Sequence, residues 1–226
     1  DCDVCLSIDE RDRRLRSSVM ITINNLNYLI DCGPDFRQQM LREQIQDIRA
    51  ILFTHEHKDH LAGLDDVRAF NFKHQKDIDV YCDLNVKKAL LREFPYVFSD
   101  FKYPGVPEVK VHQIDRDESF NIDGNLFTPI EVMHYKLPVL GFRVNDLTYI
   151  TDAKTISEKE IEKIKGTRVL VVNALRRSEH ISHFNLEQAL SFINDVSPEV
   201  AYLTHVSHLM GKREDVEKLL PDHVMF

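Results

Sequence analysis

Thr54-His55-Glu56-His57-Lys58-Asp59-His60 is the stretch of this chain that decides its fold. Three histidines and one aspartate stand within six positions, directly after the apolar run Ala50 to Thr54. The run predicts a short buried strand, and a loop held by a rigid sheet can aim side chains into a cleft. In such a loop His55 and His57 turn to one side, while Asp59 and His60, at the start of the next helix, turn to another. This pattern favours two adjacent metal ions, and imidazole with carboxylate favours zinc, manganese or iron over calcium or magnesium.

The alternative interpretation is a solvated loop that carries histidines without a chemical role. The density of donors and the preceding strand favour the metal interpretation, but one loop supplies too few ligands for two ions. Other donors follow strand-like runs elsewhere: His134 follows Leu126 to Met133, Asp152 follows Leu147 to Thr151, and His205 follows Val200 to Thr204. We therefore expect these three to complete the sites, and the carboxylate of Asp152 can bridge two ions.

The rest of the chain has the pattern of an α/β protein, without repeats or linkers. In the first half we expect strands at 19–23, 28–31, 50–54 and 78–82, of which the first two flank a hairpin turn at Asn24-Asn25. In the second half we expect strands at 110–114, 126–133, 141–144, 147–151, 168–173 and 200–204. Helices are expected at 34–42, 61–72, 84–94, 157–164, 186–194 and 212–220, the fifth of them capped by Asn185. Two strand-rich halves with helices to one side predict two packed sheets covered by helices on both outer faces. The prediction is a four-layer αββα sandwich, with residues 1–226 as a single domain.

Composition narrows the class of protein. The 226 residues include 43% hydrophobic and 29% charged residues, an ordinary globular balance. A net charge of -8 is a poor match to nucleic-acid phosphates, so we do not expect a nucleic-acid partner. No apolar run approaches the roughly 18 to 20 residues that cross a bilayer, and four cysteines do not make a disulfide scaffold. We expect a cytoplasmic protein with no membrane partner.

Several motifs together resemble a known family. The loop His55-x-His57-x-Asp59-His60, followed in order by His134, Asp152 and His205, resembles the metallo-β-lactamase fold superfamily. Within it the chain is most similar to the PhnP-type cyclic phosphodiesterases, relatives of tRNase Z. The motifs that carry this similarity are Cys2-x-x-Cys5, Arg16-Ser17-Ser18, Ile30-Asp31-Cys32-Gly33-Pro34-Asp35-Phe36-Arg37, His183-Phe184-Asn185-Leu186-Glu187 and Thr204-His205-Val206-Ser207-His208.

The resemblance implies a ligand set and two divalent ions, zinc or manganese. One ion is held by His55, His57 and His134, the other by Asp59, His60 and His205, and Asp152 bridges them. Asp31 matches an early aspartate of the family that orients loop ligands without binding the metal. The family's first strand and its Gly-rich turn are missing before Cys2, so we expect the native N-terminus to lie upstream.

The expected chemistry is hydrolysis of a phosphodiester. Two ions about 3.5 to 4 Å apart can share a hydroxide and hold both the attacking and the leaving oxygens. Asp59 and Asp152 are expected to be catalytic as ligands of these ions. His183, which resembles the family's catalytic histidine, is expected to act as the general acid. The alternative for His183 is a solvated histidine at a helix start, while His180 is expected at most to touch the substrate.

A structural zinc site is a further expectation. Cys2-x-x-Cys5 has zinc-knuckle spacing, and His208 lies three residues beyond His205. In PhnP-type proteins a third cysteine joins such a site, and its position would fall just before residue 1. The alternative is two free cysteines.

The sequence therefore predicts a dinuclear hydrolase of a small cyclic, nucleotide or sugar phosphodiester, and the resemblance suggests a homodimer. The alternative enzyme class is a PqqB-like cofactor-biosynthesis enzyme or an iron–oxygen enzyme on the same fold. Maturation of tRNA 3′ ends is disfavoured because no long Gly- or Lys-rich insertion could form a tRNA-binding arm. A non-catalytic, metal-stabilised domain is the third hypothesis, which an intact ligand set disfavours.

Overall fold

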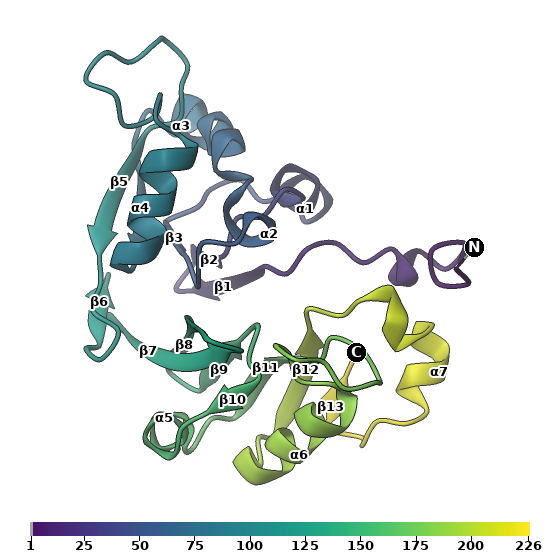
Figure 1. Ribbon diagram of the computed structural model, residues 1–226. Coiled ribbons are helices and arrows are strands. Elements are labelled where there is room, and N and C mark those ends of the chain that lie inside the picture. Colours follow the sequence, from purple (N-terminus) through teal and green to yellow (C-terminus); the bar gives the residue numbers. More distant parts are fainter. Residues whose placement is uncertain (1) are drawn as a thin grey trace. The chain divides into compact units, whose positions relative to one another are not determined.

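A computed structural model describes residues 2–226 of the chain (Figure 1). The chain forms two compact units, one of residues 15–115 and one of residues 2–14 with 116–226. Each unit has one β-sheet and its own hydrophobic core, in which helices pack against the sheet.

The sheet of residues 15–115 has five strands in the order β1-β2-β3-β4-β5. The antiparallel hairpin of β1 (Val19–Ile23) and β2 (Leu26–Ile30) is followed by three parallel strands, β3 (Ala50–Leu52), β4 (Ile78–Cys82) and β5 (Val109–Gln113). The first hairpin is the one predicted from its Asn-Asn turn. By contrast, β5 was expected among the strands of the second half of the chain, and the structure pairs it with β4 instead.

Helices of this unit pack on the core side of its sheet. They are α1 (Phe36–Arg42), α2 (Lys58–Leu61), α3 (Arg68–His74) and α4 (Leu84–Glu93), with the 3₁₀ turn η2 (Leu64–Val67) before α3. The single helix expected at 61–72 is wrong. The chain turns at Gly63, whose N–H donates to the carbonyl of Cys32, and a Cβ there would lie 2.1 Å from the carbonyl oxygen of Gly33. This close backbone contact ends α2 after one turn.

The second sheet contains eight strands, in the order β10-β7-β8-β9-β11-β12-β13 with β6 paired to β7. Strands β6 to β9 form antiparallel hairpins, while β9, β11, β12 and β13 are parallel. The bounds are β6 (Phe120–Ile122), β7 (Asn125–His134), β8 (Leu137–Val144), β9 (Leu147–Ile150), β10 (Thr155–Ile156), β11 (Val169–Asn173), β12 (Val200–Thr204) and β13 (Val224–Met225). The short strands β6, β10 and β13 had not been predicted.

Three helices complete this unit: α5 (Glu158–Ile164), α6 (Leu186–Val196) and α7 (Arg213–Glu217). The predicted cap of α6 is confirmed, because the side chain of Asn185 accepts from the N–H of Gln188 and the Gln188 side chain accepts in return. The 3₁₀ turns η1 (Glu10–Asp12) and η3 (His208–Met210) lie in the terminal segments. Asp12 accepts from the N–H of Arg213, which ties the first residues of the chain to the start of α7.

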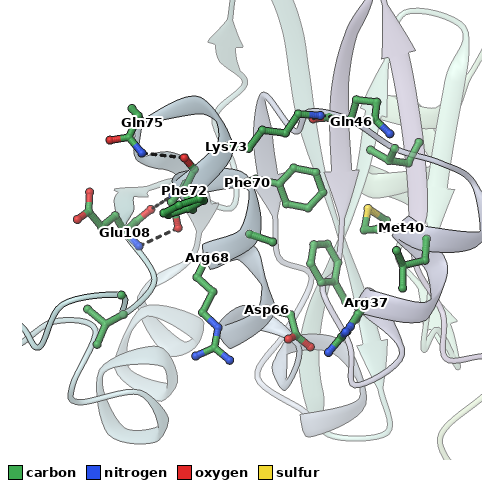
Figure 2. A pocket seen from close by; sticks show the side chains of 17 residues that line it. Arg37, Met40, Gln46, Asp66, Arg68, Phe70, Phe72, Lys73, Gln75 and Glu108 are labelled. Atoms are coloured by element: carbon green, nitrogen blue, oxygen red, sulfur yellow. Dashed lines mark hydrogen bonds between the residues drawn. The ribbon is translucent and has the colours of Figure 1, made fainter.

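A cavity of about 830 Å³ lies over α1 and α3 in the unit of residues 15–115 (Figure 2). Its lining combines apolar side chains such as Met40, Phe70 and Phe72 with the charged Arg37 and Lys73. None of the predicted metal ligands lines this cavity. Among residues 2–226, no helix is long and apolar enough to span a membrane.

Candidate metal centre

The predicted site residues of the unit 15–115 follow the ends of two neighbouring parallel strands. Asp31 comes directly after β2, and the histidine loop comes after β3. The carboxyl ends of parallel strands lie at the same edge of a sheet, so these side chains meet. Asp31 has a φ of 64°, a left-handed conformation that aspartate tolerates better than most residues. The sharp turn that this produces aims its carboxylate at the loop.

The carboxylate of Asp31 is fully buried and accepts hydrogen bonds from two loop residues. Thr54 donates its N–H at 2.9 Å and its hydroxyl at 2.9 and 3.1 Å, and His60 Nδ1 lies 2.7 Å away. Burial raises the pKa of Asp31, and the charge and hydrogen bond of His60 oppose that rise. When the His60 ring is neutral and donates its Nδ1–H to Asp31, its lone pair is on Nε2, as a metal ligand requires. The contacts fit the predicted orienting role of Asp31.

Hydrogen bonds through Thr54 orient the ring of His55. The hydroxyl of Thr54 donates to Asp31, so it can accept from His55 Nδ1, which lies 2.9 Å away. This leaves the lone pair of His55 on Nε2, only 3.0 Å from Nδ1 of His57. Two nitrogens that bind one tetrahedral ion at 2.0–2.1 Å are about 3.3 Å apart. The pair His55 and His57 therefore fits a shared divalent ion, as the sequence predicted.

Asp59 and His60 lie in α2, which begins directly after His57. Asp59 Oδ2 is 3.5 Å from His60 Nε2, so these two donors also converge on one region. The helix sits tightly on the Cys32-Gly33 turn: Cys32 donates its N–H to the carbonyl of His60, and a Cβ on Gly33 would lie 2.2 Å from the carbonyl oxygen of Asp59. Only glycine allows this approach, which explains the glycine in the motif.

The predicted ligands of the other unit also stand at strand ends. His134 is the last residue of β7, Asp152 follows β9 by one residue, and His205 follows β12 directly. Asp152 and His205 have φ values of 56° and 53°. Together with Asp31, three predicted site residues therefore adopt left-handed backbone conformations, which are uncommon outside glycine and recur at functional sites.

The carboxylate of Asp152 is the centre of this cluster. Its exposed fraction is 2%, and the hydroxyl of Thr151 donates to Oδ2 at 2.6 Å. Around Oδ1 lie His205 Nε2 at 3.3 Å, His183 Nδ1 at 3.6 Å and His134 Nδ1 at 4.0 Å. Three imidazoles around one buried carboxylate are a suitable donor set for a divalent ion.

His134 is oriented by backbone carbonyls. Its Nδ1 lies 2.9 Å from the carbonyl oxygen of Ser182 and 3.2 Å from that of Asp152. A carbonyl only accepts, so Nδ1 carries the proton and Nε2 carries the lone pair. The tautomer is the one that a ligand coordinating through Nε2 requires.

His183 packs within this cluster and has an exposed fraction of 7%. Its ring centroid is 4.5 Å from that of His134 and 4.9 Å from that of His205. Among the described residues, its Nδ1 has no hydrogen-bond partner. Burial lowers the pKa of His183 to about 3, with Asp152 opposing the shift and His205 adding to it. The alternative of a solvated histidine is thus wrong, and the imidazole is neutral in the metal-free chain.

Sequence reasoning missed Asn173, the last residue of β11. Its side chain is fully buried and forms two hydrogen bonds with the backbone of Ala153, accepting from N–H at 2.8 Å and donating to C=O at 3.1 Å. These bonds hold the turn that carries Asp152. The available signal was its position, because Asn173 is a polar residue at a strand end, like the predicted ligands.

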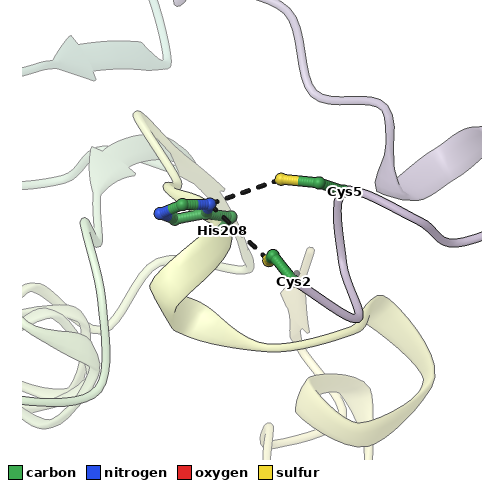
Figure 3. Close-up of side chains that lie close together, drawn as sticks. All are labelled: Cys2, Cys5 and His208. Carbon is green, nitrogen blue, oxygen red and sulfur yellow. Dashed lines mark hydrogen bonds between the residues drawn. The ribbon is translucent and has the colours of Figure 1, made fainter.

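Cys2, Cys5 and His208 come together as the spacing predicted (Figure 3). The sulfur atoms of Cys2 and Cys5 lie 3.6 and 3.4 Å from His208 Nδ1. Hydrogen bonds from Cys5 lower the pKa of the Cys2 thiol, while the Cys2 side chain raises the pKa of the Cys5 thiol. The three donors fit part of a tetrahedral zinc site, and one ligand more would complete it.

The comparisons with known proteins agree with this geometry. The sequence profile of the "Beta-lactamase superfamily domain" matches residues 26–206. A crystal structure of a diphosphatase from the PhnP family is similar over the whole chain and 86% of that protein, with 34% identity and a TM-score of 0.92. The family and fold similarities confirm the predicted α/β class, the four-layer αββα sandwich of the metallo-β-lactamase type.

Several curated proteins are similar in sequence, among them an octanoyltransferase and several ribonucleases Z. The octanoyltransferase of Porphyromonas gingivalis is 38% identical over 99% of this chain, and the ribonuclease Z of Clostridium acetobutylicum is 26% identical over 81%. The aligned regions span 45% and 60% of those proteins. This chain therefore corresponds to about half the length of the curated relatives that it matches.

Proposed function

Because this chain belongs to the beta-lactamase superfamily and resembles its PhnP-type members, we propose that it is a dinuclear metal-dependent hydrolase that cleaves a small phosphodiester. The observation that carries the proposal is the arrangement of imidazole nitrogens in each unit. His55 and His57 bring two nitrogens within 3.0 Å, and His205 Nε2 lies 3.3 Å from Oδ1 of Asp152. Hydrogen bonds that leave the lone pair on Nε2 of His55, His60 and His134 support coordination over a purely structural role.

In this proposal His55, His57 and His134 would hold one ion, and Asp59, His60 and His205 would hold the other. Asp152 would supply a carboxylate to both ions. Bound divalent ions would make a water molecule more acidic and neutralise charge on the phosphoryl oxygens. Zinc and manganese both suit a set of imidazoles and carboxylates.

His183 is proposed to supply the proton for the leaving oxygen. Burial keeps its imidazole neutral in the free chain, but a phosphodiester anion bound beside it would favour the protonated form and raise the pKa. The burial that lowers the pKa in the free chain would then strengthen the interaction of the protonated ring with the anion. General acid catalysis of this kind contributes roughly 10² to 10⁴ in rate.

Acyl transfer is the activity that the name of one relative describes, and the aligned region spans 45% of that relative. We therefore do not extend that activity to this chain. The PqqB-like and iron–oxygen alternatives differ from our proposal in consuming oxygen. A cytoplasmic location, a homodimer and a single domain over residues 1–226 stay predictions.

The experiment that tests the proposal is turnover of bis(p-nitrophenyl) phosphate by metal-stripped protein to which Mn²⁺ or Zn²⁺ is returned. We expect release of p-nitrophenol that depends on the added ion. A protein that binds two ions, releases no p-nitrophenol and takes up oxygen with its substrate would overturn the phosphodiesterase proposal in favour of the iron–oxygen alternative.

A further inference from the structure

The turn between β7 and β8 contains an unusual residue. His134 pairs with Leu137, so the hairpin loop consists of Tyr135 and Lys136 alone. Tyr135 has a φ of 59°. In two-residue hairpins of this kind a positive φ at the first loop position is normally taken by glycine, asparagine or aspartate. A bulky aromatic residue in the left-handed region is a conformational outlier, because its Cβ crowds the following carbonyl oxygen.

The other two-residue hairpins of the described chain follow the usual rule. Their loops are Asn24-Asn25, Asp123-Gly124 and Asn145-Asp146. The last is the close counterpart, because it joins the next pair of strands in the same sheet and only its first residue, Asn145, has a positive φ, of 51°. The fold thus uses asparagine where Tyr135 stands, and the turn itself does not require tyrosine.

Packing does not explain the tyrosine either. Its exposed fraction is 53%, and its ring faces the ammonium of Lys136, which lies 5.3 Å from the ring centroid. Neither side chain is part of the hydrophobic core of this unit. An exposed aromatic residue in a strained backbone conformation points to function, since strain of this kind persists where it serves binding or catalysis.

The position of the turn connects it to the candidate metal centre. The residue before Tyr135 is His134, whose Nδ1 is held by the carbonyl oxygens of Ser182 and Asp152. The loop that leads to His183 therefore lies directly against the strand end that carries Tyr135. An exposed aromatic ring and a cation stand one and two residues away from a proposed metal ligand.

We propose that Tyr135 and Lys136 bind the organic group of the substrate, and that this group is a nucleoside whose base stacks on the Tyr135 ring. The inference rests on the phosphodiesterase function proposed above. The face of a tyrosine ring accepts any nucleobase, and the lysine ammonium adds attraction for the nearby phosphate. The turn thereby selects a nucleotide diester over diesters of small alcohols.

Two substrates with the same leaving group test this selection: thymidine 5′-(p-nitrophenyl) phosphate and methyl p-nitrophenyl phosphate. The wild-type protein, loaded with Mn²⁺, is expected to have a higher kcat/KM for the thymidine ester. Tyr135→Asn should lower the ratio of the two kcat/KM values by between about 5- and 150-fold, the range that one stacked base contributes. Tyr135→Phe, which keeps the ring, should preserve the ratio.

The reciprocal change provides the matched control. Asn145→Tyr places tyrosine in the equivalent turn of the next hairpin and should lower the melting temperature without changing the ratio. Tyr135→Asn should leave the melting temperature unchanged or raise it, because asparagine tolerates the left-handed backbone. An equal kcat/KM for both esters in the wild type, or a ratio that Tyr135→Asn does not change, would overturn the selection. Hydrolysis of neither ester by protein with two bound ions would instead overturn the proposed function.

Discussion

At the scale of single residues, the surroundings of His183 determine the charge state of its imidazole. The ring is enclosed by other imidazoles and by the Asp152 carboxylate, so its charge state follows from burial and not from its ordinary pKa. A phosphodiester anion would reverse that balance by adding negative charge beside the ring. Burial thus favours the neutral ring in the metal-free chain, and a bound anion would shift the balance towards the protonated form that the proposed acid requires.

His183→Ala should reduce hydrolysis most for substrates with poor leaving groups. An alkoxide needs a proton as it leaves, whereas p-nitrophenolate does not, so the general acid matters chiefly for the former. The measurement is kcat for a series of aryl diesters with leaving groups of increasing pKa, with the exposed-site variant His223→Ala as control. The expected result is a steeper dependence on leaving-group pKa in His183→Ala, with loss of roughly 10² or more at the poor end. Equal losses across the series would remove the general-acid assignment.

The same pKa makes stability depend on pH in the metal-free protein. His183 titrates near 6.5 when unfolded and at about 3 when folded, so between these values the unfolded chain binds more protons. The stability that the neutral ring confers is therefore present above pH 6.5 and is lost as pH falls towards 3. Urea unfolding at a series of pH values should show a shallower decline in His183→Gln than in the wild type, while His223→Gln should match the wild type.

At the scale of elements, the candidate site residues lie at or just after strand ends. Hydrogen bonds from buried polar side chains stabilise the turns that follow these strands. Asn173 is the clearest case, because both its hydrogen bonds reach the backbone of Ala153 next to Asp152. Asn173→Ala leaves the buried N–H of Ala153 without this partner, at a cost of about 1–3 kcal/mol, while the C=O of Ala153 still accepts from the N–H of Phe184. We expect a lower melting temperature and about 10- to 100-fold weaker metal binding, measured by competition with a chelator. Unchanged metal affinity would show that this turn does not position Asp152.

The N-terminal segment offers a second prediction at this scale. If Cys2, Cys5 and His208 bind a zinc ion, Cys5→Ser should lower the zinc content by one ion per chain while Mn²⁺-dependent turnover persists. Metal analysis by mass spectrometry together with the melting temperature checks this. Zinc content equal to that of the wild type would contradict the site and favour two free cysteines.

Elements that leave a local signal in the sequence were predictable, whereas those that depend on distant partners were not. The histidine loop and the ends of β7, β9 and β12 were predictable because apolar runs followed by clustered donors leave a local signal. Strand β5 was placed in the wrong half, since pairing with β4 depends on contacts that a strand's own residues do not encode. The break near Gly63 and the clamp of Asn173 were missed for the same reason: their partners, Gly33 and Ala153, are distant in sequence.

At the scale of the whole molecule, the proposed ligands are divided between two units. Residues 15–115 contribute His55, His57, Asp59 and His60, while the other unit contributes His134, Asp152 and His205. Within each unit, hydrogen bonds orient the donors, but either set supplies too few ligands for two ions. Loss of a ligand from either unit should therefore impair the same reaction.

The measurement that tests this most directly is a titration of metal-stripped protein with Mn²⁺, in which turnover of a phosphodiester is followed together with bound metal. Manganese prefers oxygen and imidazole ligands to thiolates, so it avoids the cysteine site. We predict that turnover rises to a plateau at two bound ions in the wild type, and that His57→Ala and Asp152→Ala each bind fewer ions and show no turnover. Asp117→Ala, at an exposed ion pair, should behave like the wild type. Full turnover in either ligand variant, or turnover without metal, would contradict the account.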